Sequence, residues 1–169
     1  MAMNCLDVAQ VRAAFERSNV PESSWASQAT LVDDMCSEQN LQPADLGTFT
    51  EFSEVEAYRF PDGAPGVTDT HLLAVLDVGL VMMREIGLLR KRTDCQFMMF
   101  DEIRGSAFLP QESIGGRGWG HMAIQMARGS VPVFRMGWYF DERSSDPRHA
   151  VNAAANERDR VLQAIKRWI

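Results

Sequence analysis

The glycine-rich run from Ile114 to His121, IGGRGWGH, is the part of the sequence that most resembles a ligand-binding loop. A phosphate-binding loop requires the pattern GxxxxGK[ST] between a strand and a helix, whereas apolar alternation typical of strands flanks this run on both sides. We therefore interpret the run as a hairpin loop. Arg117 and Trp119 within it are candidate binding residues, because arginine and tryptophan are enriched among the residues that dominate protein interfaces.

A cluster of basic residues forms a second candidate site. We expect Gly87 to bend the chain into a tip made of Arg90, Lys91 and Arg92, with Arg84 in the preceding strand. Such a cluster suits a phospholipid headgroup or another small anionic ligand. The alternative is a solvated turn whose charges prevent the sheet edge from pairing with other chains.

A catalytic site has weaker support in the sequence. His121 suits general base catalysis, but no serine or cysteine nucleophile is placed beside it. Carboxylates that are adjacent in sequence point apart in a helix or strand, so neighbouring pairs do not form an acid–base pair. These pairs are Asp33-Asp34, Asp101-Glu102 and Asp141-Glu142. We expect no enzymatic activity, and an enzyme with a pocket near His121 is the third alternative.

The cysteines and histidines do not indicate a metal or cofactor site. The three cysteines are widely spaced and lack a CxxC pattern, and the three histidines lack HxH or HxxxH spacing. We expect no cofactor, no metal, and thiols that pack as small apolar side chains. The residues concerned are Cys5, Cys36, Cys95, His71, His121 and His149.

Charge divides the 169-residue chain into two segments and argues against nucleic acid as a partner. The net charge is −6. Residues 1–65 carry 3 basic and 11 acidic side chains, whereas residues 66–169 carry 14 basic and 12 acidic ones. No apolar run has the length of a transmembrane helix, and the first ten residues lack the basic and apolar regions of a signal peptide. We therefore expect a cytoplasmic location.

The acidic segment predicts two helices. The first follows a cap at Asn4 or Asp7 and ends before Pro21, and the second begins near Ser23 or Ser24. A helical hairpin of this size cannot bury its apolar stripes alone, so it must pack on the rest of the chain or on a partner. After it, we expect a turn or short helix up to Glu54.

The following sequence predicts short strands, because apolar residues alternate with a period of two. Thr93–Phe100 is apolar on both faces, which predicts a strand covered on both sides for part of its length. The expected strands are Val55–Phe60, Thr70–Leu76, Val78–Ile86, Thr93–Phe100, Ile103–Leu109, a strand around Met122–Met126, and Val131–Phe140. Pro110 is expected to end the fifth strand, and Pro132 implies that the last strand is an edge strand or begins there.

The last element is an amphipathic helix. Asp146 is its expected N-cap, and Pro147 occupies the first helical position. Val151, Leu162 and Ile165 belong to its apolar face. Glu157 is expected on a polar face, and Arg158 falls on the apolar side, where we expect it to extend to solvent or pair with a carboxylate.

These elements resemble the bacterial pleckstrin-homology (PH)-like domains, over residues 55–169. Leu73–Arg84, LAVLDVGLVMMR, is similar to the segment in which a strand of those domains ends in a T/L-D-x-G-L turn and the next strand begins. Asp101-Glu102-Ile103 is similar to the polar-polar-Ile step before their following strand. The C-terminal ERDRVLQAIKRWI resembles the helix that plugs the open end of their barrel.

The resemblance implies an α+β fold. Residues 55–169 would form a seven-stranded PH-like antiparallel barrel or sandwich capped by the C-terminal helix, and residues 1–54 a helical extension. PH-like domains bind phosphoinositides, peptides or other domains. We therefore expect a non-enzymatic module that acts through protein–protein contacts or self-association. The alternative is binding of a phospholipid headgroup or small ligand at Arg84, Arg90, Lys91 and Arg92.

Overall fold

The computed structural model describes residues 8–41, 45, 47–58, 68–114, 117–127, 133–139 and 147–167. Its helices are α1 (Val8–Glu16), the 3₁₀ turn η1 (Glu22–Ser24), α2 (Trp25–Glu38), the 3₁₀ turn η2 (Phe100–Glu102) and α4 (Pro147–Lys166). Its strands are β1 (Phe49–Tyr58), β2 (Thr68–Leu76), β3 (Gly79–Ile86), β4 (Arg92–Met99), β5 (Ile103–Ile114), β6 (Arg117–Met126) and β7 (Val133–Tyr139). The predicted α+β class, with N-terminal helices and a C-terminal helix, is confirmed.

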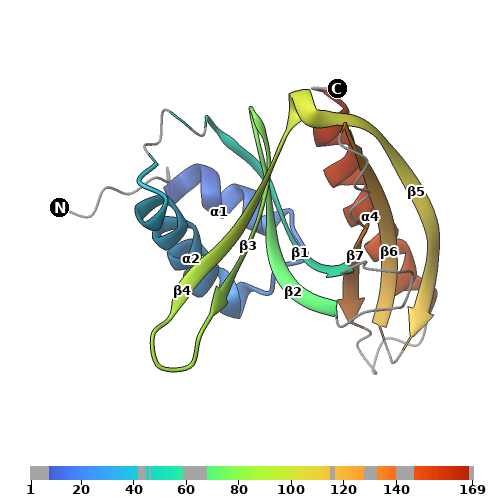
Figure 1. Ribbon diagram of the computed structural model, residues 1–169. Coiled ribbons are helices and arrows are strands. Elements are labelled where there is room, and N and C mark those ends of the chain that lie inside the picture. Colours follow the sequence, from blue (N-terminus) through green and yellow to red (C-terminus); the bar gives the residue numbers. More distant parts are fainter. Residues whose placement is uncertain are drawn as a thin grey trace.

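The strands pair antiparallel in the order β4-β3-β2-β1-β7-β6-β5. β1 pairs with β2 along its whole length but with β7 only over Val55–Tyr58, so two halves of the sheet diverge from β1 (Figure 1). Within the described residues, no ladder joins β4 to β5, and the strands therefore do not form a closed barrel. The barrel expected from the resemblance is corrected to an open, bent sheet.

The helices cover opposite faces of the β1–β4 half. In Figure 1, α1 and α2 lie on one side of this half, and α4 lies on the other, enclosed by β5, β6 and β7. The faces alternate along β2: Leu72, Ala74 and Leu76 pack with α1 and α2, while Leu73 and Val75 pack with α4. Two apolar cores thus share one layer of strands. The helical hairpin packs on the rest of the chain, which was one of the two expected possibilities.

A stack of aromatic rings joins the helical layer to β1. The ring of Phe15 lies 4.5 Å from that of Phe52 and 6.3 Å from that of Trp25, and Phe49 stacks on Phe52 at 5.5 Å. The indole of Trp25 also donates a hydrogen bond to the carbonyl of Val20. Three buried phenylalanine rings and the partly buried Trp25 therefore fix α1 and α2 against the same strand.

The expected start of the first strand was wrong, because β1 begins at Phe49 and not at Val55. The pairing of β1 with β2 shifts between Phe49 and Glu51, which leaves Thr50 as the extra residue of a β-bulge. The bulge puts Phe49 and Phe52 on the same face although they are three residues apart. A spacing of three residues is typical of one face of a helix, which explains the wrong prediction. The boundary expected between a turn or helix ending at Glu54 and a strand starting at Val55 falls inside β1.

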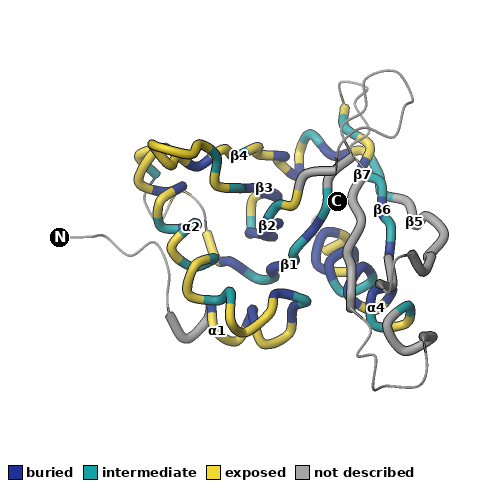
Figure 2. The backbone as a smooth tube through the Cα atoms, turned by 90° about the horizontal axis from the view of Figure 1, so that it is seen from below, coloured by how far each residue is buried: buried dark blue, intermediate teal, exposed yellow. Residues whose placement is uncertain are grey.

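β4 is covered on both faces for part of its length, as predicted, whereas the predicted end of β5 needs correction. In β4, Met98 is buried, but Phe97 and Met99 on the other face are 36% and 38% exposed, because α2 covers that face only near Thr93 and Cys95 (Figure 2). β5 continues through Pro110 to Ile114, since it is an edge strand and its register shifts between Leu109 and Glu112. An edge position with a bulge tolerates the missing N–H of proline.

The glycine-rich run is not a loop where the structure describes it. β6 begins at Arg117, which pairs with Ile114 of β5 and Tyr139 of β7. Gly120 allows α4 to approach this strand: a Cβ at Gly120 would meet the backbone carbonyl oxygen of Ala154 and lie 2.9 Å from its carbonyl carbon. The glycine therefore serves packing between helix and strand. Asn4, Asp7, Arg59, Phe60, Pro132 and Asp146 lie outside the described residues.

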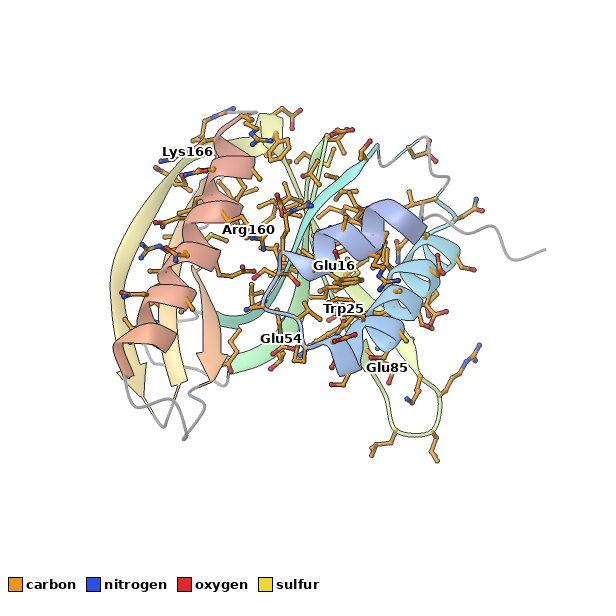
Figure 3. All side chains as sticks on the ribbon, turned by 180° about the vertical axis from the view of Figure 1, so that it is seen from behind. Glu16, Trp25, Glu54, Glu85, Arg160 and Lys166 are labelled. Atoms are coloured by element: carbon orange, nitrogen blue, oxygen red, sulfur yellow. The ribbon has the colours of Figure 1, made fainter. Side chains whose placement is uncertain are left out.

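A polar network ties α4 to β1 and to the segment that follows α1. Glu157 was expected to face water, but it is buried and accepts hydrogen bonds from Arg160 and from the backbone N–H of Asn19. Arg160 also pairs with Glu51 and donates to the carbonyl of Phe52 at 2.8 Å (Figure 3). Arg158 pairs with the carboxylate of Asp159 at 2.9 Å, and pairing with a carboxylate was one of its two expected arrangements. Buried charges of this kind are tolerated when they are paired and hydrogen-bonded.

We predict that Phe52→Ala lowers the free energy of unfolding by about 3–5 kcal/mol, because it leaves a cavity at the centre of the ring stack. The matched control is Phe97→Ala, for which we expect a loss of about 1 kcal/mol since this ring is partly in water. Urea unfolding followed by circular dichroism measures both values. Equal losses for the two variants would contradict the assigned core.

We predict that Gly120→Ala destabilises the fold by about 1–3 kcal/mol, because the added methyl group forces α4 away from β6. Gly105→Ala in β5 is the control: its Cβ would meet nothing nearer than the Gln125 side chain at 3.8 Å. We expect that change to stay within about 0.5 kcal/mol of the unaltered protein. Thermal denaturation of the two variants compares them directly.

Candidate functional site

A groove lies between α2 and the strands β2 and β3. Its volume is about 610 Å³. The lining comprises Ser27, Gln28, Thr30, Leu31 and Asp34 from α2, Thr70, His71 and Leu72 from β2, and Met83, Arg84 and Glu85 from β3. The groove arises because α2 crosses the strands and leaves the start of β2 and the end of β3 partly uncovered.

The groove combines an apolar floor with a polar rim. Leu72 and Met83, which are fully buried members of the core under α2, line the groove, and we call this apolar part of the lining its floor. Asp34 and Glu85 add negative charge to the rim, and Ser27 and Thr30 are exposed hydroxyls. A concave site with an apolar surface and a few polar groups around it is typical of ligand-binding pockets.

Gln28 adds a hydrogen-bond acceptor to this site. Its Oε1 atom is buried and, within the described part of the chain, accepts no hydrogen bond. A buried amide oxygen without a donor costs free energy, which a ligand with an N–H group would recover. Because Gln28 lines the groove, this acceptor belongs to a residue of the site.

The β3–β4 hairpin extends from one end of the groove and carries the basic cluster. Glu85 marks its base next to α2 (Figure 3), and the loop beyond it projects away from the body of the protein (Figure 1). Gly87 bends the chain at φ 98°, as expected from the sequence. At the end of the loop, Leu88 and Leu89 are 99% and 103% exposed.

The predicted basic residues do not converge on a single pocket. Arg84 reaches back to Asp94 on the facing strand, with Nε 3.3 Å from Oδ2, and lines the groove. Lys91 pairs with Glu85 at 2.7 Å, and this hydrogen bond raises the pKa of Lys91, which keeps its positive charge. Arg90 and Arg92 are exposed. Two of the four candidates thus already contact carboxylates of the same hairpin.

The remaining candidates lie elsewhere in the sheet. Arg117 and Trp119 are in β6, on the half of the sheet that encloses α4, and their side chains are outside the described part of the structure. His121 pairs in the ladder with Leu109 and Arg135 and does not line the groove. The structure therefore brings neither the glycine-rich run nor His121 to the basic hairpin.

The sequence interpretation missed most of the groove. Among its lining residues only Arg84 was a candidate, because Ser27, Gln28 and Thr30 read as the polar face of a surface helix. The two leucines at the hairpin tip were also overlooked, although their position between Gly87 and three basic residues marks them as loop residues. Two adjacent apolar residues in an expected turn were the sequence signal that could have identified an exposed apolar tip.

The described residues contain no group of three or more histidine, cysteine or acidic side chains arranged to hold a metal ion. Among these residues there is also no helix long and apolar enough to cross a membrane.

Comparison with known proteins leaves the chain without an assigned family. No protein-family model and no curated protein matches the sequence. One similar solved structure is titled "Vav1 inhibited by an allosteric inhibitor: Vav1 inhibitors block GEF activity", with a TM-score of 0.42 and 10% sequence identity. The match covers 79% of this chain and 37% of that one. Similarity at this level carries no argument about function.

We predict that Cys95 reacts slowly with alkylating agents. This residue lies on β4 and pairs with the groove residue Met83 of β3. Burial raises the pKa of this thiol, and the nearby carboxylates of Asp94 and Glu38 raise it further. At about pH 8 its thiolate fraction should be smaller than that of a free cysteine. We therefore expect slower labelling by iodoacetamide, measured for each cysteine by peptide mass spectrometry.

The same measurement on Asp94→Asn should show faster labelling of Cys95, with its pH profile displaced to lower pH, because one of the negative charges is removed. Asp101→Asn, an exposed carboxylate beyond the end of the strand, serves as the control and should leave the profile unchanged. An unchanged profile for Asp94→Asn would contradict this electrostatic contribution.

Proposed function

We propose that this protein is a non-enzymatic binding module that recognises an extended segment of a protein partner in the α2/β2/β3 groove. The observation that carries the proposal is the groove itself, with its apolar floor of Leu72 and Met83 and the buried Oε1 of Gln28. An apolar side chain of the partner would occupy the floor, and an N–H donor would bind Gln28. The partner is another protein or a second copy of the chain.

Charge narrows the chemistry of that partner. The carboxylate of Asp34 stands on the rim, whereas Arg84 and Glu85 already pair with Asp94 and Lys91. A basic residue next to the apolar anchor would therefore be favoured over an acidic one, through electrostatic complementarity. Such recognition depends on a few buried anchors, with the surrounding contacts supplying shape complementarity.

A PH-like scaffold is the fold that we propose for this module. The support is the antiparallel sheet with a C-terminal helix packed into one of its faces, together with the sequence similarities at Leu73–Arg84 and at the end of the chain. The division into a helical extension, 1–54, and a PH-like domain, 55–169, remains a prediction, and β1 runs across it.

Binding of a lipid headgroup or small anion in a pocket at the basic hairpin is the second candidate. The exposed Arg90 and Arg92 favour it, but Arg84 and Lys91 would have to exchange their carboxylate partners for the ligand. A small ligand gains little from such an exchange in water. The protein-binding groove therefore has the stronger support.

Selection of peptides displayed on phage tests the groove. We expect peptides selected on the unaltered protein to contain an apolar residue beside a basic one, and to bind Thr30→Trp at least about tenfold more weakly, since the indole fills the groove. Ser37→Trp is the matched control, because Ser37 is also exposed on α2 but does not line the groove. Fluorescence polarisation measures the affinities.

Peptides that bind both tryptophan variants equally well would contradict the groove as the binding site. Failure to select any peptide, with both variants folded by circular dichroism, would contradict recognition of an extended segment.

A further inference from the structure

The tip of the β3–β4 hairpin, Gly87–Arg92, has a composition that neither the groove nor a headgroup pocket explains. Leu88 and Leu89 are almost completely in water, and three basic residues follow them directly. The other exposed large apolar residues in the described structure, Val78, Phe97 and Met99, are exposed by 36–40%. Fully exposed leucines next to each other at a projecting tip contribute no packing to the fold, and such apolar surface marks interaction sites.

The groups along the hairpin are arranged in layers. The two leucines lie in the loop, followed by Arg90 and Lys91, and Arg92 faces Ile86 on the first rung of the ladder. The acidic residues come further back: Glu85 faces Thr93 on the second rung, and Asp94 faces Arg84 on the third. Apolar groups therefore stand furthest from the body, cations behind them, and carboxylates last.

This order matches the layers that a protein meets at an anionic bilayer. The acyl-chain boundary accepts apolar side chains, the phosphate layer attracts arginine and lysine, and acidic groups stay in water. Each basic residue near an anionic surface adds to the attraction, and insertion of apolar side chains adds affinity that salt does not screen. A convex tip suits insertion between lipids, whereas a protein pocket would require a complementary hollow in the partner.

The rest of the hairpin holds the tip in position. The φ of Gly87, 98°, is closed to most L-residues, and a Cβ there would meet the backbone carbonyl of Arg90. At the base, both carboxylate oxygens of Glu38 accept a hydrogen bond from the N–H of Thr93, at 2.9 and 3.2 Å, which fixes β4 to α2. Lys91 pairs with Glu85 across the loop. Few degrees of freedom are thus lost when the tip docks.

We propose that this hairpin is a membrane-surface anchor, in which Leu88 and Leu89 insert into the interface of an anionic bilayer while Arg90 and Arg92 contact lipid phosphates. The inference is independent of the groove, which would remain free to bind its partner while the tip is inserted.

Sedimentation with vesicles tests the anchor. We expect the protein to bind vesicles of mixed phosphatidylcholine and phosphatidylserine at least about tenfold more strongly than pure phosphatidylcholine vesicles. Leu88→Ser/Leu89→Ser should lower binding to the anionic vesicles by at least about tenfold, because no apolar side chain then enters the interface. Arg90→Gln/Arg92→Gln should weaken binding and reduce its salt dependence.

Matched controls separate the tip from other surfaces. Val78→Ser removes an exposed apolar side chain at the opposite end of β3 and should leave vesicle binding unchanged. Thr30→Trp, which fills the groove, should also leave it unchanged. Inorganic phosphate at millimolar concentration should not release the bound protein, since a free phosphate offers no apolar layer; release would indicate a phosphate site in place of an anchor.

Three further results would overturn the proposal. One is a lack of binding to anionic vesicles by the unaltered protein. Another is binding that persists in Leu88→Ser/Leu89→Ser, which would make the attraction purely electrostatic. The third is self-association in sedimentation velocity that the two serines abolish while vesicle binding is unaffected, which would assign the leucines to a contact between copies of the chain.

Discussion

Burial of β2 and β3 on both faces is the constraint on which the rest of the structure depends. Leu72 and Met83 point towards α1 and α2, while Leu73 and Met82 point towards α4. A strand with apolar residues at every position is stable only when two separate layers cover it. The N-terminal helices and the C-terminal helix supply these layers, so segments from both ends of the chain complete one fold.

The candidate site follows from the incomplete cover of this layer. α2 spans the strands obliquely and leaves part of β2 and β3 accessible, which creates a groove whose floor belongs to the core itself. Because the floor is rigidly packed, a ligand there meets a preformed surface. The hairpin that continues from β3 extends beyond both helical layers. Its tip residues are therefore accessible to a membrane surface while the groove is accessible to a protein partner.

The predictable parts of the fold were those in which local pattern and final environment agree. The alternation of Leu72 to Leu76 gave a correct strand, and Pro147 at the first position of α4 gave a correct helix start.

The predictions that failed did so because of tertiary contacts that the local sequence does not show. The bulge at Thr50 changed the period of β1, and the edge position of β5 let Pro110 lie within a strand. Glu157 is buried because Arg160 and Asn19 meet it. The i,i+3 spacing permits the pair with Arg160, but the contact with Asn19, 138 residues away, cannot be read from spacing along the helix. The groove was hidden because its lining comes from three elements.

The position of α4 after all the strands has a consequence for synthesis. On the ribosome, α1, α2 and β1–β4 emerge first and already contain all members of the core under the helices. Their other face, with Leu73, Val75, Leu80 and Met82, stays uncovered until β5–β7 and α4 have been made. Nascent chains with such an exposed apolar sheet face are prone to aggregation. A nascent chain that has not yet reached Pro147 would therefore contain every member of the core under the helices, while its opposite face lacks the helix that covers it.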